Sequence, residues 1–259
     1  MEIEFFEVDA TGHSGAEEGL MLFALRPEAA WDGGPRRLRE CPLFQHVSAS
    51  QLRAVLRDAS TLRVGRGGFY FREGDRATKA YVLVRGRVNL VRAGSVARRG
   101  ILQFVSPVEP FGYEAAFGGA GHVVSAQASE DSEALVWPAG ALVHLMTNHP
   151  MIARNSLRLM AEGIQGKWER INGLLTEPLE RRVARALLRL SSRIGRRVGR
   201  GRAITLTLNH QDLAAFVGTT PYSISRIFSA WKRLRIVDAR RGWVVIRPRR
   251  LATLVGNRG

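Results

Sequence analysis

The segment 204–246 constrains the fold of this chain more than any other part of the sequence. It contains two helix-like stretches, 210–217 and 221–234, with only a short turn between them. Gly218 suits the left-handed conformation that commonly ends a helix, and Thr220 followed by a proline is a typical start of the next one. The pattern therefore predicts two short helices joined by a tight turn, a helix-turn-helix.

Residues of high strand propensity lie on both sides of this helix pair. Alternating β-branched residues at 204–208 predict a strand before the helices, and residues 236–237 and 242–246 predict a β-hairpin after them. This arrangement is typical of a winged helix-turn-helix. In that motif the second helix enters the major groove of DNA, and the residues near its N-terminus contact the base edges.

The residues predicted to contact DNA lie on the second helix and at the tip of the hairpin. Arg226 lies one turn inside the helix and can donate two hydrogen bonds to guanine. Ser225 and Tyr222 can donate, accept or contact a thymine methyl, whereas Lys232 and the hairpin arginines are expected to lie beside phosphates. The predicted DNA contacts are Thr220, Tyr222, Ser223, Ser225, Arg226, Lys232, Arg240 and Arg241.

The distribution of charge supports a polyanionic partner. Residues 178–259 contain nineteen Lys/Arg and three Asp/Glu, so they carry the whole formal net charge of +16. The first 35 residues instead contain eight acids and one base. Such a split indicates parts with different partners, and the basic part suits DNA. Residues 195–202 are expected to form a flexible basic loop, either solvated or beside phosphates.

Apolar residues recur in alternating steps of four and three along a stretch that begins after Pro150 and ends before Pro178. This spacing predicts one long helix with a narrow apolar stripe, and we interpret the stripe as the seam of a homodimer. The alternative is a helix packed on its own domain. The predicted seam residues are Leu157, Ala161, Ile164, Trp168, Ile171 and Leu175.

Between about residue 62 and residue 136, short strand-like runs alternate with glycine-rich turns, which predicts an antiparallel roll or barrel. The runs 81–84 and 88–91 flank Gly86 and predict a hairpin. Upstream, Ser48 and Gln51 predict a capping box at the start of a helix.

The chain resembles the Crp/Fnr superfamily of bacterial regulators over roughly residues 38–250. The matching segments are Leu43-Phe44, 71–75, 81–88, Phe111-Gly112, 212–214, 217–220 and Ser225-Arg226. The resemblance implies a cyclic-nucleotide-binding β-roll, a long dimer helix and a winged helix-turn-helix that binds a palindrome. It also implies that Ser225 and Arg226 read bases. Tyr222 departs from the family, in which a glutamate commonly stands there.

The β-roll departs from the relatives that bind cyclic AMP. Those relatives have a Gly-Glu-Leu segment, followed some ten residues later by an arginine that pairs with the phosphate. Here the acid, Glu114, is shifted by one position, and residues 121–126 contain no arginine. A buried phosphate without its partner is costly, so cyclic AMP bound in the usual mode is not expected. The candidate effector residues are Glu114, His122 and Ser125.

We therefore expect an α+β protein with four parts. These are an acidic N-terminal extension (1–37), a jelly-roll-like antiparallel β-roll sensor (38–147), a dimerisation helix (148–177) and a winged helix-turn-helix domain (178–259). A signal in the β-roll is expected to act through a hinge near Glu177-Pro178.

No catalytic motif and no histidine pair for a metal is present, so the chain is expected to be neither an enzyme nor a metal protein. Its single cysteine, Cys41, excludes an internal disulfide and a typical iron–sulfur cluster. No cofactor is expected to be required. Haem or a cyclic nucleotide is not favoured as the effector, and a small anion, a lipid-like molecule, a cyclic dinucleotide or no ligand remain open.

The expected partners are double-stranded DNA, a second copy of the chain and, for an activator, RNA polymerase. No long apolar stretch or secretory signal is present, so we expect a cytoplasmic protein without a membrane partner. The alternatives are a ligand-binding module that regulates a protein partner and a protein that packages nucleic acid without sequence preference.

Overall fold

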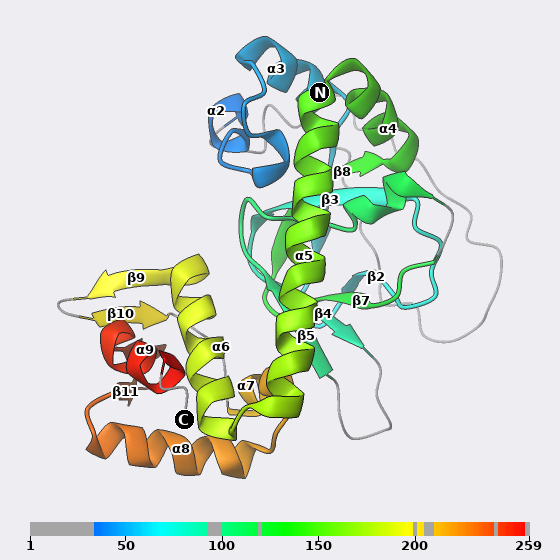
Figure 1. Cartoon of the computed structure of the whole chain (residues 1–259). Coiled ribbons are helices and arrows are strands. Elements are labelled where there is room, and N and C mark those ends of the chain that lie inside the picture. The colour runs from blue at the N-terminus through cyan, green and yellow to red at the C-terminus, as the bar shows by residue number, and fades with distance from the viewer. Residues whose placement is uncertain are drawn as a thin grey trace.

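The structure of this chain is a computed structural model, which describes residues 34–92, 100–118, 121–198, 201–204, 210–240 and 243–256. Its N-terminal half contains two four-stranded antiparallel sheets (Figure 1). The first has the order β1 (Ser60–Val64), β8 (Ser132–Pro138), β3 (Lys79–Arg85), β6 (Pro110–Phe111). The second has the order β2 (Phe69–Phe71), β7 (Ser125–Ala128), β4 (Val88–Arg92), β5 (Gly100–Val105). The predicted β-roll is confirmed.

The first sheet is buried on both faces because successive side chains of a strand point to opposite sides. Tyr81 and Leu83 of β3 join the core between the two sheets, whereas Val82 faces a second core beneath helices. Trp137 of β8 lies in that second core and donates its indole N–H to the Val55 carbonyl oxygen at 2.8 Å. The covering elements are α2 (Gly34–Leu38), the 3₁₀ helix η1 (Pro42–Phe44), α3 (Ala49–Arg57) and α4 (Ala139–Asn148).

The N-terminus of α3 confirms the predicted capping box. The Ser48 hydroxyl accepts from the backbone N–H of Gln51 at 3.3 Å, and the Gln51 side chain accepts from the backbone N–H of Ser48 at 2.9 Å. The acidic extension predicted for residues 1–37 lies outside the described residues except for its last four positions.

The predicted hairpin around Gly86 is wrong. β3 belongs to the first sheet and β4 to the second, so the turn carries the chain across the roll instead of pairing the two strands. The chain crosses back near Asp131, between β7 and β8, and the two crossings touch. Gly86 has a φ of 83°, and a Cβ there would lie 2.4 Å from the Asp131 carbonyl oxygen. Both a hairpin turn and such a corner need glycine, so the local sequence does not distinguish them.

Helix α5 (Pro150–Thr176) joins the β-roll to the C-terminal part of the chain (Figure 1). Its 27 residues correspond to about 40 Å at 1.5 Å per residue. The helix ends just before Pro178, and α6 (Leu179–Ile194) begins immediately after it, as the proline predicted.

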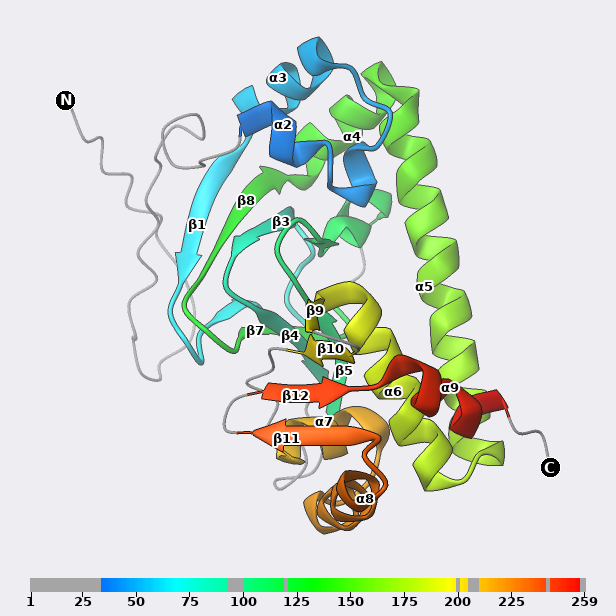
Figure 2. The same ribbon diagram turned by 90° about the vertical axis from the view of Figure 1, so that its left-hand side faces the viewer.

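The C-terminal part has the predicted helix-turn-helix and wing. Its helices are α6, α7 (His210–Val217), α8 (Pro221–Arg233) and α9 (Pro248–Gly256). Its sheet has the order β11 (Val237–Arg240), β12 (Trp243–Ile246), β10 (Gly201–Ile204), β9 (Gly195–Val198) (Figure 2). Strands β11 and β12 are the predicted hairpin, whereas α9 was not predicted and packs on α6 through its buried Leu251.

The expectation of a loop at 195–202 is wrong for the described residues. They form β9 and β10, because β10 pairs with β12, more than forty residues further along the chain. Of the strand predicted for 204–208, only Ile204 is described, as the last residue of β10, and residues 205–208 lie outside the described residues.

Candidate nucleic-acid interface and its junction with the β-roll

The turn between α7 and α8 fixes the start of the second helix. Gly218 has a φ of 77° and donates its N–H to the Ala214 carbonyl oxygen at 2.9 Å, which ends α7 in the left-handed conformation. Thr220 is the N-cap of α8, and its hydroxyl accepts from the backbone N–H of Ser223 at 3.2 Å. Pro221 follows as the first helical residue. All three features agree with the sequence prediction.

One face of α8 is locked into the core, and the other is exposed. Ile224, Ile227, Phe228 and Trp231 are buried. Tyr222 is 72% exposed, and Ser225 and Arg226 are also exposed. The structure thus brings the predicted base-reading side chains together on the free face of the first two turns. The Ser223 hydroxyl differs because it lies 3.0 Å from the Thr220 hydroxyl and is partly buried.

The predicted phosphate contacts are more widely spread. Lys232 is exposed in the last turn of α8, away from the base-reading residues. Arg240 ends β11, and its side chain is not described. Arg241 lies outside the described residues.

Two of the three candidate effector residues contact one segment of the β-roll. His122 stacks on Phe71, with ring centroids 3.6 Å apart, and burial lowers the pKa of its imidazole. The Ser125 hydroxyl accepts from the Glu73 backbone N–H at 2.9 Å. Glu114 is exposed on the 3₁₀ helix η2 (Tyr113–Phe117), and within the described residues no hydrogen bond joins it to His122 or Ser125.

Aromatic rings fill the β-roll next to these residues. Tyr81 and Phe111 stack with centroids 5.0 Å apart, and Tyr70 meets Phe111 edge-on at 5.2 Å. Gly112 has a φ of 64° and packs against these rings, because a Cβ there would lie 3.0 Å from ring atoms of both Phe71 and Tyr81. These rings therefore form the wall of the β-roll beside His122.

The predicted seam residues of α5 form an exposed stripe. Trp168 is 66% exposed and Leu175 is 79% exposed, although both are large apolar side chains. The other seam residues, Leu157, Ala161, Ile164 and Ile171, are exposed as well. The first turns of α5 are held differently: Ile152 is buried, and the Asn155 amide donates to the carbonyl oxygens of η1 and the turn after it.

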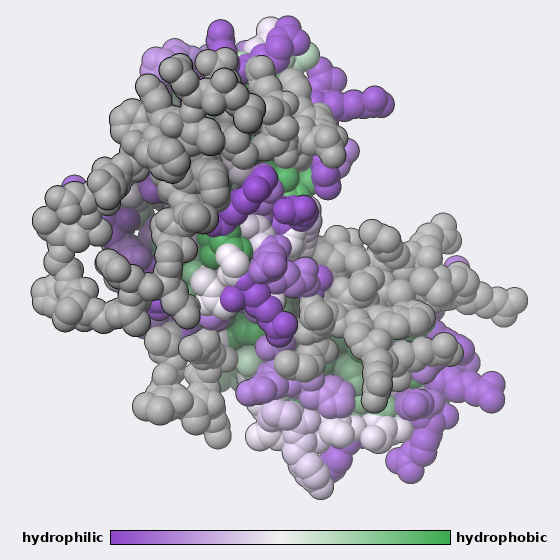
Figure 3. Space-filling model, turned by 180° about the vertical axis from the view of Figure 1, so that it is seen from behind, coloured by the Kyte–Doolittle hydropathy of each residue, from purple (hydrophilic) through white to green (hydrophobic). Residues whose placement is uncertain are grey.

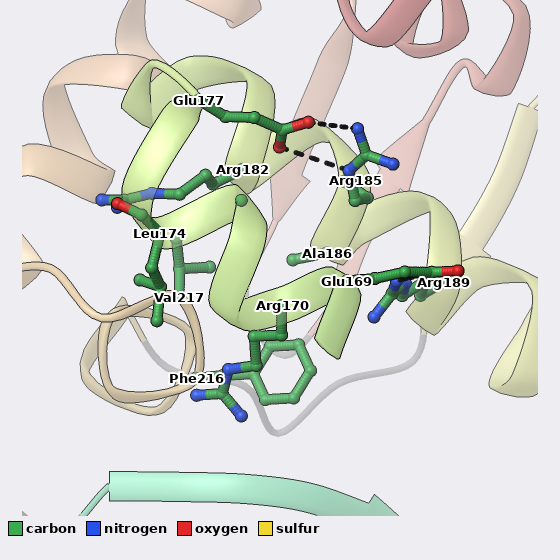
Figure 4. Close-up of a pocket in the computed structure, with 11 residues that line it drawn as sticks. Glu169, Arg170, Leu174, Glu177, Arg182, Arg185, Ala186, Arg189, Phe216 and Val217 are labelled. Atoms are coloured by element: carbon green, nitrogen blue, oxygen red, sulfur yellow. Dashed lines mark hydrogen bonds and ion pairs between the residues drawn. The ribbon is translucent and has the colours of Figure 1, made fainter. Parts of the chain in front are cut away.

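A junction between the β-roll and the helix-turn-helix lies on the other side of α5. Arg170 donates from Nη1 to the Leu102 carbonyl oxygen at 3.0 Å and from Nη2 to the Ile101 carbonyl oxygen at 3.3 Å, both in β5. Its guanidinium also lies 5.1 Å from the ring centroid of Phe216 in α7 (Figure 4). Burial, with the nearby Arg189, lowers the pKa of Arg170.

Apolar and charged contacts extend this junction. Phe104 of β5 and Phe216 of α7 have ring centroids 5.0 Å apart. Burial raises the pKa of the Asp212 carboxyl at the start of α7, and Arg87 of the β-roll opposes that shift. Phe104 belongs to the same buried apolar cluster as the C-terminal helices, and Phe216 packs against that cluster, so β5 and α7 share one core although they are far apart in the sequence.

A pocket with a volume of about 420 Å³ lies where the last turns of α5 meet α6 and the end of α7 (Figure 4). Glu177 pairs with Arg185, and Glu169 pairs with Arg189. Arg170 and Arg182 also line the pocket, so its walls keep a net positive charge. The pairs join α5 to α6 across the predicted hinge at Glu177-Pro178. We interpret this region as a joint between the two helices.

Sequence reasoning missed the junction. Arg170 lies beside the apolar seam in the sequence and looks like any solvated arginine of a helix, and β5 carries no unusual pattern. Within the described residues, no helix is long and apolar enough to cross a membrane, and no group of three His, Cys, Asp or Glu side chains is arranged to hold a metal ion.

Comparisons with known proteins match both halves of the chain. Residues 61–149 match the cyclic nucleotide-binding domain family, and residues 181–254 match the Crp-like helix-turn-helix domain family. The chain is 24% identical over 207 residues to the CRP-like cAMP-activated global transcriptional regulator of Mycobacterium tuberculosis, covering 80% of this chain and 89% of that protein. It is 26% identical over 210 residues to the cyclic AMP receptor protein of Thermus thermophilus, covering 81% and 94%.

A solved structure with a similar fold is FixK2 from Bradyrhizobium japonicum. It has a TM-score of 0.69 and 23% sequence identity, and the match covers 78% of this chain and 99% of FixK2. The order of β-roll, long helix and helix-turn-helix is therefore shared along nearly the full length of that protein.

We predict that replacing Arg170 with Met loosens the junction. Methionine keeps the apolar stem but removes the two hydrogen bonds to β5, so the free energy of unfolding should fall by about 1 to 2 kcal/mol in urea denaturation. The matched control is Lys167→Met, which removes an exposed charge from the same helix. Equal effects of the two substitutions would show that the Arg170 contacts do not stabilise the junction.

Proposed function

Because this chain belongs to the Crp/Fnr superfamily of transcriptional regulators, we propose that it binds a palindromic DNA operator as a homodimer, under the control of a signal received by its β-roll. The observation that carries the proposal is the free face of α8. Arg226, Ser225 and Tyr222 point away from a helix whose opposite face is locked into the core. Members of this family are regulators and not enzymes, in agreement with the prediction from the sequence.

The proposed reading of DNA follows from the position of each side chain. Arg226 donates two hydrogen bonds to a guanine, and Ser225 contacts the neighbouring base. Tyr222 replaces a carboxylate that accepts from cytosine in other members, so the half-site differs at that base pair. Thr220 and Ser223 hold the start of the helix, and Lys232, Arg240 and Arg241 contact phosphates.

The proposed dimer uses the exposed stripe of α5. Monomeric proteins rarely leave a continuous row of large apolar side chains in water, and such rows mark interaction sites. The spacing of four and three is that of two helices packed along a shared seam. A two-fold axis along α5 places two copies of α8 in successive major grooves, about 34 Å apart.

We propose that the effector is not cyclic AMP bound in the usual mode, although relatives are named for that nucleotide. Residues 121–126 lack the phosphate-binding arginine, Glu114 is exposed, and aromatic rings fill the adjoining core. His122, which stacks on Phe71, and Ser125, which accepts from the Glu73 backbone N–H, are candidates for contact with a different effector. We propose that no cofactor is required.

We propose that the signal passes through the junction to α7 and through the hinge at 177–178. The domains proposed are the extension 1–37, the β-roll 38–147, the dimer helix 148–177 and the DNA-binding domain 178–259. The protein acts in the cytoplasm with no membrane partner, and RNA polymerase is a further partner if it activates transcription.

Selection of random duplex DNA on the purified protein, at two salt concentrations, tests the function. We expect an enriched inverted repeat with half-sites about 10 base pairs apart, because two recognition helices are related by a two-fold axis. Steeply salt-dependent binding without any motif would favour either a packaging protein or a regulator that is inactive without its effector. No DNA binding at either salt concentration would favour a module that regulates a protein partner.

Arg226→Ala is expected to weaken binding to the selected operator by about 1 to 3 kcal/mol and to relax the preference at one base pair. The control is Arg226→Lys, which keeps the charge but cannot reproduce the planar two-bond contact. Binding isotherms on operators changed at each position measure both effects. A uniform loss on every sequence would assign Arg226 to a phosphate.

Trp168→Glu is expected to separate the homodimer, because two carboxylates would meet across the seam at its largest apolar contact. Sedimentation velocity should show a shift from dimer to monomer at micromolar concentration. Lys167→Glu, which adds a carboxylate at the preceding position outside the predicted seam, should remain dimeric. If the tryptophan variant stays dimeric as well, the seam lies elsewhere.

A further inference from the structure

A second basic surface lies at the far end of α8 from the base-reading residues. We name it the C-terminal basic patch, and it consists of Lys232, Arg233, Arg235, Arg247, Arg249 and Arg250. All six side chains are exposed. Figure 3 shows strongly hydrophilic residues at the lower right of the molecule.

Tertiary contacts bring the two halves of the patch together. The Arg250 guanidinium donates to the Leu234 carbonyl oxygen at 2.9 Å, and the Arg247 backbone N–H donates to the Ile236 carbonyl oxygen at 3.0 Å. The end of α8 and the start of α9 are thereby held side by side, although more than ten residues separate them in the sequence. The patch is a property of the fold and not of one charged run.

The charge of the patch is not neutralised by neighbouring carboxylates. The only acidic side chains after residue 209 are Asp212 and Asp238. Among the described residues, no ion pair involves Lys232, Arg233, Arg235, Arg247 or Arg249.

Two of the arginines occupy positions that are unfavourable for the stability of the folded state. Arg235 has a φ of 53°, a left-handed conformation in which glycine is strongly preferred. Arg249 lies in the first turn of α9, where a positive charge opposes the helix dipole. Other members have simpler structural reasons: Lys232 and Arg233 lie in the favourable last turn of α8, and Arg250 binds a carbonyl oxygen. The folded state alone therefore does not explain Arg235 and Arg249.

We propose that the C-terminal basic patch binds phosphates of duplex DNA outside the base pairs read by the start of α8. This inference rests on the proposed function. Lys232 follows Tyr222 by ten positions on α8, which is about 15 Å at 1.5 Å per residue, so the patch lies beyond the base-reading residues along the helix. The patch thus reaches the flank of the half-site, and its contacts carry affinity without base preference.

The test compares two duplexes that contain the selected operator, one bare and one with about ten extra base pairs on each side. The wild-type dimer should bind the flanked duplex more tightly. The double variant Arg235→Gln/Arg249→Gln removes four charges from the dimer. It should lose most of this gain and reduce the slope of log affinity against log salt by roughly 3 to 4, while selecting the same motif.

Two controls separate contact from folding. Arg53→Gln/Arg57→Gln removes the same charge from the exposed face of α3 and should leave the gain unchanged. Arg235→Gly removes a patch charge and relieves the left-handed conformation, so it should weaken flank binding while the unfolding midpoint stays equal or rises. A loss of flank binding accompanied by a lower midpoint would overturn the assignment of Arg235.

The proposal is overturned if the wild-type dimer gains nothing from flanks, or if the double variant keeps both the gain and the salt slope. Failure of the proposed function has a different signature, because selection then returns no motif. In that event the same variants are measured on random-sequence duplexes. A reduced salt slope there still supports the patch as a phosphate-binding surface, and an unchanged slope overturns it.

Discussion

The contact between α7 and β5 is the interaction on which the arrangement of this molecule depends. Phe216 and Phe104 meet there, and Arg170 of α5 donates to β5 beside them. Helix α7 also supports α8, whose buried face belongs to the same core. In the proposed path of the signal, a displacement of β5 reaches α8 through these packed side chains, because protein interiors have low compressibility.

Helix α5 combines three roles because its faces and ends meet different neighbours. Its first turns are anchored in the β-roll through Ile152 and Asn155. Its last turns hold the junction through Arg170, whereas Trp168, only two positions earlier, points into water. In the proposed dimer this helix would carry both the seam and the path of the signal.

The β-roll matches the cyclic nucleotide-binding domain family, and aromatic rings line its interior. Rings occupy the region next to His122, and Gly112 is required so that the chain can pass close to them. A fold of this kind does not by itself specify its ligand, because the ligand is recognised by side chains that the framework does not need.

The sequence by itself determined the elements that depend on neighbours in the chain. Contacts over three or four residues form the capping box at Ser48, the turn at Gly218 and the start of α8 at Thr220. The exposed stripe of α5 follows from a residue spacing of four and three. The fold class and the free face of α8 followed from these patterns.

The tertiary structure decided whatever depends on a distant partner. Gly86 marks a corner between sheets because Asp131 lies against it, and β10 is a strand because β12 pairs with it. The contacts of Arg170 and the C-terminal basic patch likewise join segments that local periodicity does not connect. Local patterns record which conformation a segment prefers, whereas only the folded chain brings together the groups that make a joint or a charged surface.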